Sequence, residues 1–166
     1  MELRGLLEAA KNENEDDEED ANAFEDVKVD VSSSKINAAL THLNTIRAKN
    51  PDDKVIIVSQ FTKLLSIFQP LLDDEGYKWT RLDGTMSTRQ RSEIIANFQD
   101  VSPDAPKVLL LSLRAGGVGL NLNVANHMIL LDPAWNPSTE EQCFDRIHRL
   151  GQTKDVEIVR FVMKNS

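Results

Sequence analysis

VIIVSQF, at residues 55–61, is the stretch that decides the fold of this chain. Its first four residues are apolar and β-branched, which is typical of a strand buried on both faces. The polar pair Ser59-Gln60 ends this run, and apolar residues then recur at helical spacing from Phe61 onward. A buried strand that leads directly into a helix is the repeating unit of a parallel sheet covered by helices.

The same alternation of apolar runs and helical patterns continues on both sides of this stretch. Further strands are predicted at four segments: residues 78–82, 108–111, 128–131 and 156–162. Helices are predicted at four segments: Ser32–Ser34 to Asn50, Phe61 to about Gly76, Ser87 through Phe98, and Ser138 to about Leu150. Capping boxes, Ser87 with Gln90 and Ser138 with Glu141, mark the starts of the last two. The order predicts a three-layer α/β fold with a mainly parallel sheet.

The charge of the chain is divided unevenly along its length. The 166 residues carry a net charge of −8, but residues 1–30 hold 12 acidic and 3 basic side chains. Residues 31–166 hold 15 acidic and 16 basic side chains, so this body is almost neutral and could still present a basic face to nucleic acid. We therefore predict an acidic leader at residues 1–31 and one domain at residues 32–166.

The carboxylate-dense run at residues 12–26 is predicted to be disordered, because like charges repel and little apolar surface is available to bury. Such a run fits a solvated linker, and it also fits a segment that contacts basic histone or DNA-binding surfaces. The sequence leaves both interpretations open.

Several classes of protein are excluded by composition. No apolar run approaches the ~20 residues that cross a bilayer, and the N-terminus lacks a secretory signal. The single cysteine, Cys143, excludes an internal disulfide, and it reads as a small buried hydrophobe rather than a nucleophile. The three histidines are far apart, so no metal site is predicted. No glycine is followed by lysine, which excludes a P-loop and hence a self-sufficient nucleotide triphosphatase.

Polar, glycine-rich or aromatic segments follow four of the predicted strands. They are Ser59-Gln60-Phe61, Asp83-Gly84, residues 112–119 and residues 132–137. Because parallel strands end at the same edge of a sheet, we expect these segments to meet where α/β folds bind ligands. Gly116, Gly117 and Gly119 would let backbone N–H groups approach an anion, although Leu122 stands where a dinucleotide fingerprint needs glycine.

The helix predicted from Ser138 carries Gln142, Arg146 and Arg149 within about 60° of one another. Two guanidinium groups on this face suit phosphate recognition, although a solvated polar face with arginines paired to neighbouring carboxylates fits as well. Trp135, which lies between Pro133 and Pro137, is either a hydrophobic plug on the core or an aromatic ring held at the ligand-binding edge.

Taken together, these segments resemble the C-terminal helicase lobe of the Swi/Snf-type DNA-dependent ATPases. The matching stretches occur in the family's order: VIIVSQF at 55–61, RLDG at 81–84, LLLSLRAGGVGLNL at 109–122, DPAWNP at 132–137 and QCFDRIHRLGQ at 142–152. The resemblance covers residues 32–166, and the wording is most similar to the branch that contains helicase-like transcription factor and the transcription termination factor. It implies a RecA-like fold.

The resemblance also implies a function. The chain would be the second lobe of a two-lobed, ATP-dependent motor that tracks along double-stranded DNA in the nucleus, in chromatin remodelling, transcription or DNA repair. ATP with Mg²⁺ would be held mainly by the N-terminal lobe, which this chain lacks, together with the helical segment that normally follows the last strand. We therefore expect a fragment or truncated product that is inactive as an ATP hydrolase by itself. The partners that the resemblance implies are double-stranded DNA, the N-terminal lobe, and nucleosomes or other DNA-bound proteins.

The roles implied by the resemblance fall on three groups of residues. DNA-backbone contacts match Ser59, Gln60, Arg81, Gly84, Ser112 and Arg114, and a loop near the DNA matches Trp135 and Asn136. Nucleotide contacts match Gly117, Gly119 and Gln142, and the paired arginine fingers match Arg146 and Arg149. The competing hypotheses are a non-catalytic DNA- or chromatin-binding module and an unrelated small α/β enzyme. The paired arginines favour the motor lobe, because simple phosphate binding does not need them.

Overall fold

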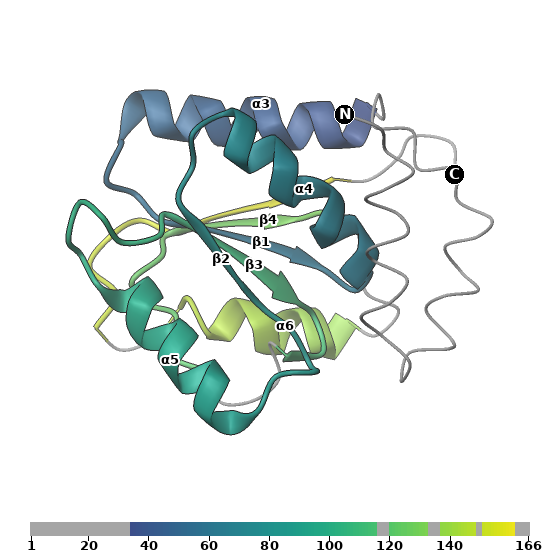
Figure 1. The fold of residues 1–166 in the computed structure, drawn as a ribbon, viewed down its shortest axis with the longest axis vertical. Coiled ribbons are helices and arrows are strands. Elements are labelled where there is room, and N and C mark those ends of the chain that lie inside the picture. Colours follow the sequence, from purple (N-terminus) through teal and green to yellow (C-terminus); the bar gives the residue numbers. More distant parts are fainter. Residues whose placement is uncertain (1–33, 116–119, 133–136, 149–150, 162–166) are drawn as a thin grey trace.

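The computed structural model describes residues 34–115, 120–132, 137–148 and 151–161 of the chain (Figure 1). One sheet contains five strands: β1 Val55–Ser59, β2 Trp79–Leu82, β3 Val108–Ser112, β4 His127–Leu130 and β5 Glu157–Arg160. The strand order across the sheet is β2-β3-β1-β4-β5, and every pairing is parallel. The predicted strands and their parallel arrangement are confirmed.

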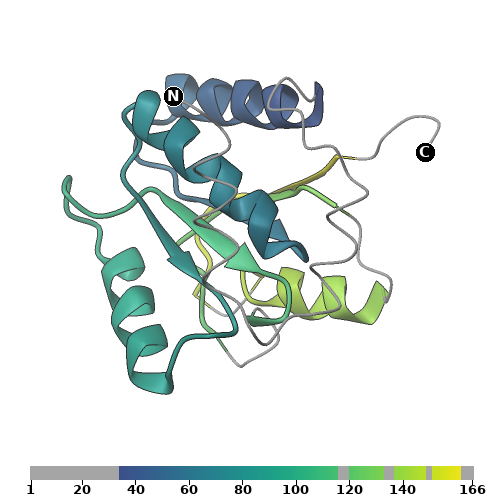
Figure 2. The same ribbon diagram turned by 45° about the vertical axis from the view of Figure 1, so that its right-hand side comes forward.

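Among the described residues, four helices cover the two faces of this sheet. They are α3 Ser34–Lys49, α4 Thr62–Asp74, α5 Thr88–Gln99 and α6 Pro137–Asp145. The helices α3 and α4 lie on one face, and α5 and α6 lie on the other (Figures 1 and 2). The predicted three-layer α/β fold is therefore confirmed.

The central strand β1 contributes to both hydrophobic cores. All five of its residues are buried, and alternate side chains point to opposite faces. Ile57 packs in the cluster that includes Phe68 of α4, whereas its neighbour Ile56 packs in the cluster that includes Phe98 of α5. Burying each such side chain stabilises the fold by roughly 1.5–3 kcal/mol, so the apolar run acts on both layers at once.

The end of α4 is set by a glycine. Gly76 has a φ of +75°, a conformation that other residues adopt only with strain. Its N–H donates to the carbonyl of Asp73, and the next N–H, of Tyr77, donates to that of Leu72. These bonds satisfy carbonyls that the helix leaves unpaired, which confirms the predicted stop near Gly76.

The start of α5 confirms the first predicted capping box. The Gln90 N–H donates to Ser87 Oγ at 3.2 Å, and the Ser87 N–H donates to Gln90 Oε1 at 2.9 Å. Both donors would otherwise have no partner within the helix.

The helix α6 differs from its prediction at both ends. It begins at Pro137, so Ser138 lies inside the helix and is not its N-cap. Proline suits the first helical position, because an N–H there would have no partner in the helix. The helix ends at Asp145, so the prediction of a helix that continues to about Leu150 was wrong.

Hydrogen bonds from outside α6 explain its early end. The Arg146 N–H donates to the carbonyl of Cys143, only three residues back, which tightens the chain into a turn. The Leu122 N–H and the Gln152 side chain then donate to the carbonyls of Arg146 and Ile147. A helix that continued to about Leu150 would need the Arg146 carbonyl for its own hydrogen-bond ladder.

The predicted acidic leader at residues 1–31 lies outside the described residues. The described body begins at Ser34, the first residue of α3. The leader and its disordered run stay predictions, and so does the boundary near residue 32.

Candidate functional site

The chain leaves the parallel neighbouring strands β1 and β4 toward opposite sides of the sheet. After β1 the chain turns through α4 toward β2 at one edge of the sheet, whereas after β4 it turns through α6 toward β5 at the other edge (Figure 1). Loops that diverge in this way leave a crevice at the carboxyl ends of the two strands, which is the usual ligand site of an open α/β sheet. Ser59 ends β1 at this point, and Asp132 follows β4.

Ser59 and Asp132 join the two diverging loops. Ser59 Oγ donates to Asp132 Oδ1 at 2.7 Å, and the Gln60 N–H donates to Asp132 Oδ2 at 3.1 Å. The Phe61 N–H in turn donates to Ser59 Oγ at 3.0 Å. Both Ser59 and Asp132 are buried, and this burial raises the pKa of the Asp132 carboxyl although the two hydrogen bonds oppose it. The Ser59 hydroxyl therefore faces an interior carboxylate.

Arg81 of β2 is also engaged inside the protein. Its Nη1 donates to Ser66 Oγ and to Gln69 Oε1, both at 2.7 Å, and its Nε donates to Asp83 Oδ2 at 3.2 Å. Only 11% of the side chain is exposed. The guanidinium therefore ties β2 to α4 and to the loop that follows β2.

The same loop places Gly84 at the surface. Asp83 Oδ1 accepts hydrogen bonds from the N–H and the hydroxyl of Thr85, which shapes the turn around Gly84. A Cβ atom added at Gly84 would meet no protein atom within 4 Å, so the space beside its backbone is open to a ligand.

The loop after β3 contains one buried and one exposed predicted residue. Ser112 is buried, and its Oγ accepts a hydrogen bond from the Ala115 N–H at 3.3 Å. Arg114 is exposed. At the carboxyl ends of the strands, Arg114 and Gly84 are therefore exposed, whereas Ser59, Arg81 and Ser112 have partners inside the protein.

Two predicted nucleotide-site residues lie in or just after α6. Gln142 is exposed on the helix, and Arg146 lies in the turn that follows it. Arg146 Nε is buried and has no acceptor among the described residues. Burial raises the pKa of the Cys143 thiol to about 12, in keeping with its prediction as a small buried hydrophobe.

Five predicted site residues lie outside the described residues: Gly117, Gly119, Trp135, Asn136 and Arg149. Their roles stay predictions.

Gln152 is a residue whose role the sequence did not reveal. Its Nε2 donates to the carbonyls of Asn123, Ala125 and Ile147 at 3.0, 2.8 and 3.2 Å. It therefore fastens the turn after α6 to the segment that leads into β4. Its place at the end of the motif at 142–152 marked the residue, but the sequence did not indicate its partners, because Asn123 and Ala125 are distant along the chain.

Residues 34–151 match the family described as the helicase conserved C-terminal domain. This chain belongs to that family.

Two relatives place this helicase C-terminal domain in a narrower group of proteins. The chain is 52% identical over 135 residues to human helicase-like transcription factor, which covers 81% of this chain and 13% of that protein. It is 45% identical over 140 residues to the DNA repair protein RAD5 of Cryptococcus neoformans, which covers 84% of this chain and 12% of that protein. The chain thus spans about an eighth of the length of these relatives, and the predicted Swi/Snf-type group is confirmed.

A solved structure shares the fold of this helicase C-terminal domain. It is the crystal structure of the C-terminal part of the Fun30 ATPase domain, with a TM-score of 0.76 and 38% identity. The match covers 81% of this chain and 42% of the other. The fold is therefore RecA-like, as predicted.

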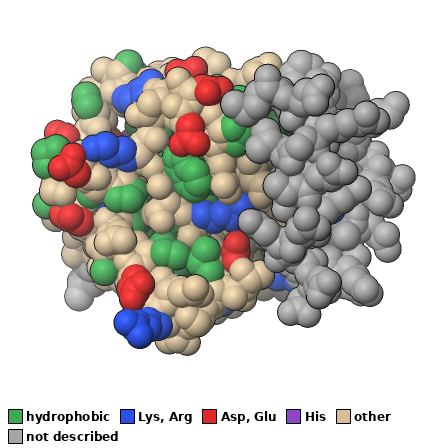
Figure 3. Space-filling view, in the orientation of Figure 1, with side chains coloured by type: hydrophobic (Ala, Val, Ile, Leu, Met, Phe, Trp, Pro, Cys, Tyr) green, Lys and Arg blue, Asp and Glu red, His purple; other side chains and the backbone are tan. Residues whose placement is uncertain are grey.

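The surface of the described residues carries both acidic and basic side chains. On the face that carries α4, acidic, basic and hydrophobic side chains are interspersed (Figure 3). Within the described ranges, no helix is long and apolar enough to cross a bilayer, and no three or more His, Cys, Asp or Glu side chains cluster as metal ligands.

Proposed function

We propose that this helicase C-terminal domain is the second motor lobe of an ATP-dependent translocase on double-stranded DNA. The complete protein would act in the nucleus, in chromatin remodelling, transcription or DNA repair. The names of the relatives support this proposal, since they include a helicase-like transcription factor, a DNA repair protein and an ATPase domain.

One observation carries the motor assignment. The Leu122 N–H donates to the Arg146 carbonyl at 3.1 Å, so the turn that carries Arg146 is hydrogen-bonded to the segment that follows Gly117 and Gly119. This bond between the segment after the assigned nucleotide loop and the turn of Arg146 supports a common nucleotide site.

Arg146 fits an anionic ligand. Its Nε is a buried donor with no acceptor among the described residues, and a buried unpaired donor costs about 1–3 kcal/mol. A guanidinium also remains charged at any relevant pH and offers several donors in one plane. A phosphate oxygen would supply the missing acceptor, and ATP with Mg²⁺ is the cofactor that we assign, held mainly by the N-terminal lobe of the complete protein.

The chain's own residues would then perform two tasks. Arg146, with Arg149, would stabilise negative charge on the oxygens of the transferred phosphoryl group. Gly117, Gly119 and Gln142 would contact the nucleotide from this side of the cleft. Closure of the two lobes would bring the arginines into place, which would couple hydrolysis to movement along DNA.

The DNA contacts divide into two groups. We assign direct contact with the phosphate backbone to the exposed Arg114 and Gly84 and to the half-buried Gln60, with Trp135 and Asn136 as further contacts. Ser59, Arg81 and Ser112 have interior partners, so they would act by holding the loops that meet the DNA. Such contacts provide affinity with little sequence preference.

The test compares Arg146→Ala and Arg146→Lys in the complete protein. We expect DNA-stimulated ATP hydrolysis to fall by about 10³ or more in both, with nucleotide affinity nearly unchanged. Lysine should fail because its ammonium lacks the planar donor fork. Arg89→Ala is the matched control, because this arginine is 90% exposed and pairs with Glu93 on the surface of α5.

The alternative is a non-catalytic DNA- or chromatin-binding module. If the domain is such a module, both Arg146 variants should hydrolyse ATP normally while their binding to DNA changes. Any ATPase activity of the isolated chain above buffer would also contradict the motor-lobe assignment, since this chain has no P-loop.

A further inference from the structure

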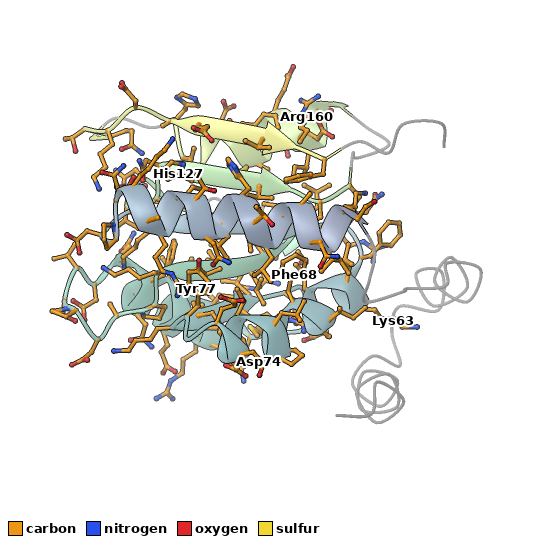
Figure 4. All side chains as sticks on the ribbon, turned by 90° about the horizontal axis from the view of Figure 1, so that it is seen from above. Lys63, Phe68, Asp74, Tyr77, His127 and Arg160 are labelled. Carbon is orange, nitrogen blue, oxygen red and sulfur yellow. The ribbon has the colours of Figure 1, made fainter. Side chains whose placement is uncertain are left out.

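The loop between β2 and α5 lies at the edge of the sheet to which we assign the DNA. Because every strand pairing is parallel, this loop shares its edge with the segments that follow β1, β3 and β4. Figure 4 shows the two ends of the sheet: Lys63, near the start of α4, lies at the carboxyl end, opposite His127, the first residue of β4. The charges of the β2–α5 loop therefore affect how the domain would meet a phosphate backbone.

The segment from Arg81 to Glu93 contains three arginines and two carboxylates. Two of the arginines are paired with these carboxylates. Arg81 Nε lies 3.2 Å from Asp83 Oδ2, with both side chains mostly buried, and Arg89 Nε lies 3.3 Å from Glu93 Oε1 at the surface. Both carboxylates of the segment are thereby engaged, and Arg91 is the arginine that remains.

Arg91, near the start of α5, has neutral partners. Its Nε donates to the carbonyl of Met86 at 3.2 Å, and its Nη2 donates to the carbonyl of Gly84 at 3.3 Å. Within the part of the chain that the structure describes, no carboxylate forms an ion pair with this guanidinium. A guanidinium has five N–H groups, so donors remain for a further acceptor. Arg91 therefore keeps both its charge and part of its hydrogen-bonding capacity.

The carbonyls that hold Arg91 border an open part of the surface. Gly84 is exposed, and a Cβ atom added there would meet no protein atom within 4 Å. The Asp83 carboxylate, which precedes it, accepts hydrogen bonds from Arg81 and from Thr85, and the residue is only 7% exposed. This carboxylate would therefore oppose an anion beside Gly84 only weakly.

Arg81 and Arg91 differ in what each would lose on binding a phosphate. Every nitrogen of the Arg81 guanidinium already donates to Asp83 or to groups of α4. A rotation of Arg81 toward DNA would break these bonds and leave a mostly buried carboxylate unpaired. Arg91 is half-buried and would give up no ion pair, so binding an anion is easier for this residue.

We propose that Arg91 is the cation with which the loop after β2 binds a phosphate of the DNA backbone, in place of Arg81. This inference rests on the proposed function and adds a residue to its DNA contacts. The bonds to Gly84 and Met86 hold the guanidinium beside the loop, and its remaining N–H groups donate to phosphate oxygens. The planar donor fork suits phosphate, and such a contact carries no sequence information.

The test measures the binding of a fluorescently labelled DNA duplex to the 166-residue chain by anisotropy at several salt concentrations. We expect Arg91→Gln to weaken binding about tenfold at low salt and to reduce the salt slope by about 1, because one charged phosphate contact is lost. Arg91→Lys should keep the slope, since an ammonium still neutralises the phosphate, and should recover part of the affinity.

Arg89→Gln is the matched control. On α5 this residue lies about 200° around the helix axis from Arg91, and its charge is already paired with Glu93. Its replacement should leave both the affinity and the salt slope unchanged. Equal losses in Arg89→Gln and Arg91→Gln would overturn the proposal, because a diffuse positive surface would then explain the binding.

The remaining outcomes separate this contact from the proposed function. If the original chain binds duplex DNA and Arg91→Gln keeps its affinity and salt slope, the proposal is wrong and the DNA-binding function stands. An equal fall of the slope in Arg91→Gln and Arg91→Lys would also overturn it, since Arg91 would then act only by holding the loop. An original chain without affinity for duplex DNA would contradict the proposed function, and this contact with it.

Discussion

Ser59 Oγ lies 2.7 Å from Asp132 Oδ1, although the two residues are 73 positions apart in the sequence. This hydrogen bond joins the loops that follow β1 and β4, at the point where the chain turns toward opposite edges of the sheet. The carboxylate also accepts the Gln60 N–H, so it fixes the backbone as well as the side chain of the β1 loop. The loops assigned to DNA are therefore held by a buried polar link.

We expect Ser59→Ala to destabilise the chain by about 1–3 kcal/mol, because it leaves a buried carboxylate without one of its donors. Urea unfolding of the 166-residue chain measures this change. Ser92→Ala is the control, since its Oγ donates to the carbonyl of Thr88 on an exposed turn of α5 and its loss should change stability by less than about 0.5 kcal/mol. Equal effects of the two substitutions would show that the link to Asp132 is unimportant.

Lys54 should make stability depend on pH in the alkaline range. Its pKa is about 8 in the folded chain and 10.5 without the fold, so the unfolded chain binds more protons between these values. Lys54 should therefore contribute a rise of about 1–3 kcal/mol to the free energy of unfolding between pH 8 and 10.5. The raised pKa of the Cys143 thiol contributes in the opposite direction above pH 9, so the comparison is made with a variant that lacks only the lysine. Unfolding curves of Lys54→Met should lack this rise.

The control for that experiment is Lys78→Met. Lys78 is 54% exposed and pairs with Asp104, which is 96% exposed. Its replacement should leave the pH dependence of the original chain unchanged. A rise of equal size in Lys54→Met would contradict the role given to the buried ammonium.

Duplex DNA binding by the chain should be weak and strongly dependent on salt, because backbone contacts release counterions. Arg114→Ala should weaken binding equally across DNA sequences and reduce the salt slope by about 1. Arg81→Ala should lower both binding and stability, since this side chain bonds to Ser66, Gln69 and Asp83. Anisotropy titrations at several salt concentrations, paired with unfolding curves, separate the two effects. Strong preference for one DNA sequence would be inconsistent with this expectation.

Gln152→Leu should loosen the turn after α6. The substitution leaves three carbonyls without their donor, and we expect a loss of about 2–3 kcal/mol. Hydrogen exchange of the Leu122 N–H, which donates to Arg146, should accelerate more than exchange in β1. Gln99→Leu is the matched control, because its amide makes one exposed bond, to the Asn121 carbonyl. Unchanged exchange at Leu122 would argue against the positioning role.

Trp135→Ala, made in the complete protein, tests a residue outside the described part of the chain. If the ring contacts DNA, the variant should lose DNA-stimulated turnover or translocation while basal ATP hydrolysis persists. Turnover with and without duplex DNA measures this difference. A variant that fails to fold would instead identify Trp135 as a hydrophobic plug on the core.

Local signals in the sequence determined the elements of the fold. The β-branched run at residues 55–58 specified a strand buried on both faces, because apolar side chains on both sides of a strand need a covering layer on each. The Ser87–Gln90 box and Gly76 specified helix ends, because their bonds and dihedral angles involve residues only a few positions away. The order of the family's motifs further identified the helicase C-terminal domain.

Only the tertiary structure decided what those residues do. The end of α6 at Asp145 depends on donors from Leu122 and Gln152, which no periodicity in the helix itself contains. Arg81, predicted as a DNA contact, has interior partners on α4, and the Ser59 hydroxyl faces Asp132. A pocket lined by Lys54, Lys107 and Lys154 also unites segments that precede four different strands. Each of these features arises because a parallel sheet brings residues far apart in sequence to a common edge, and the strand order that does so is set by packing across the whole domain.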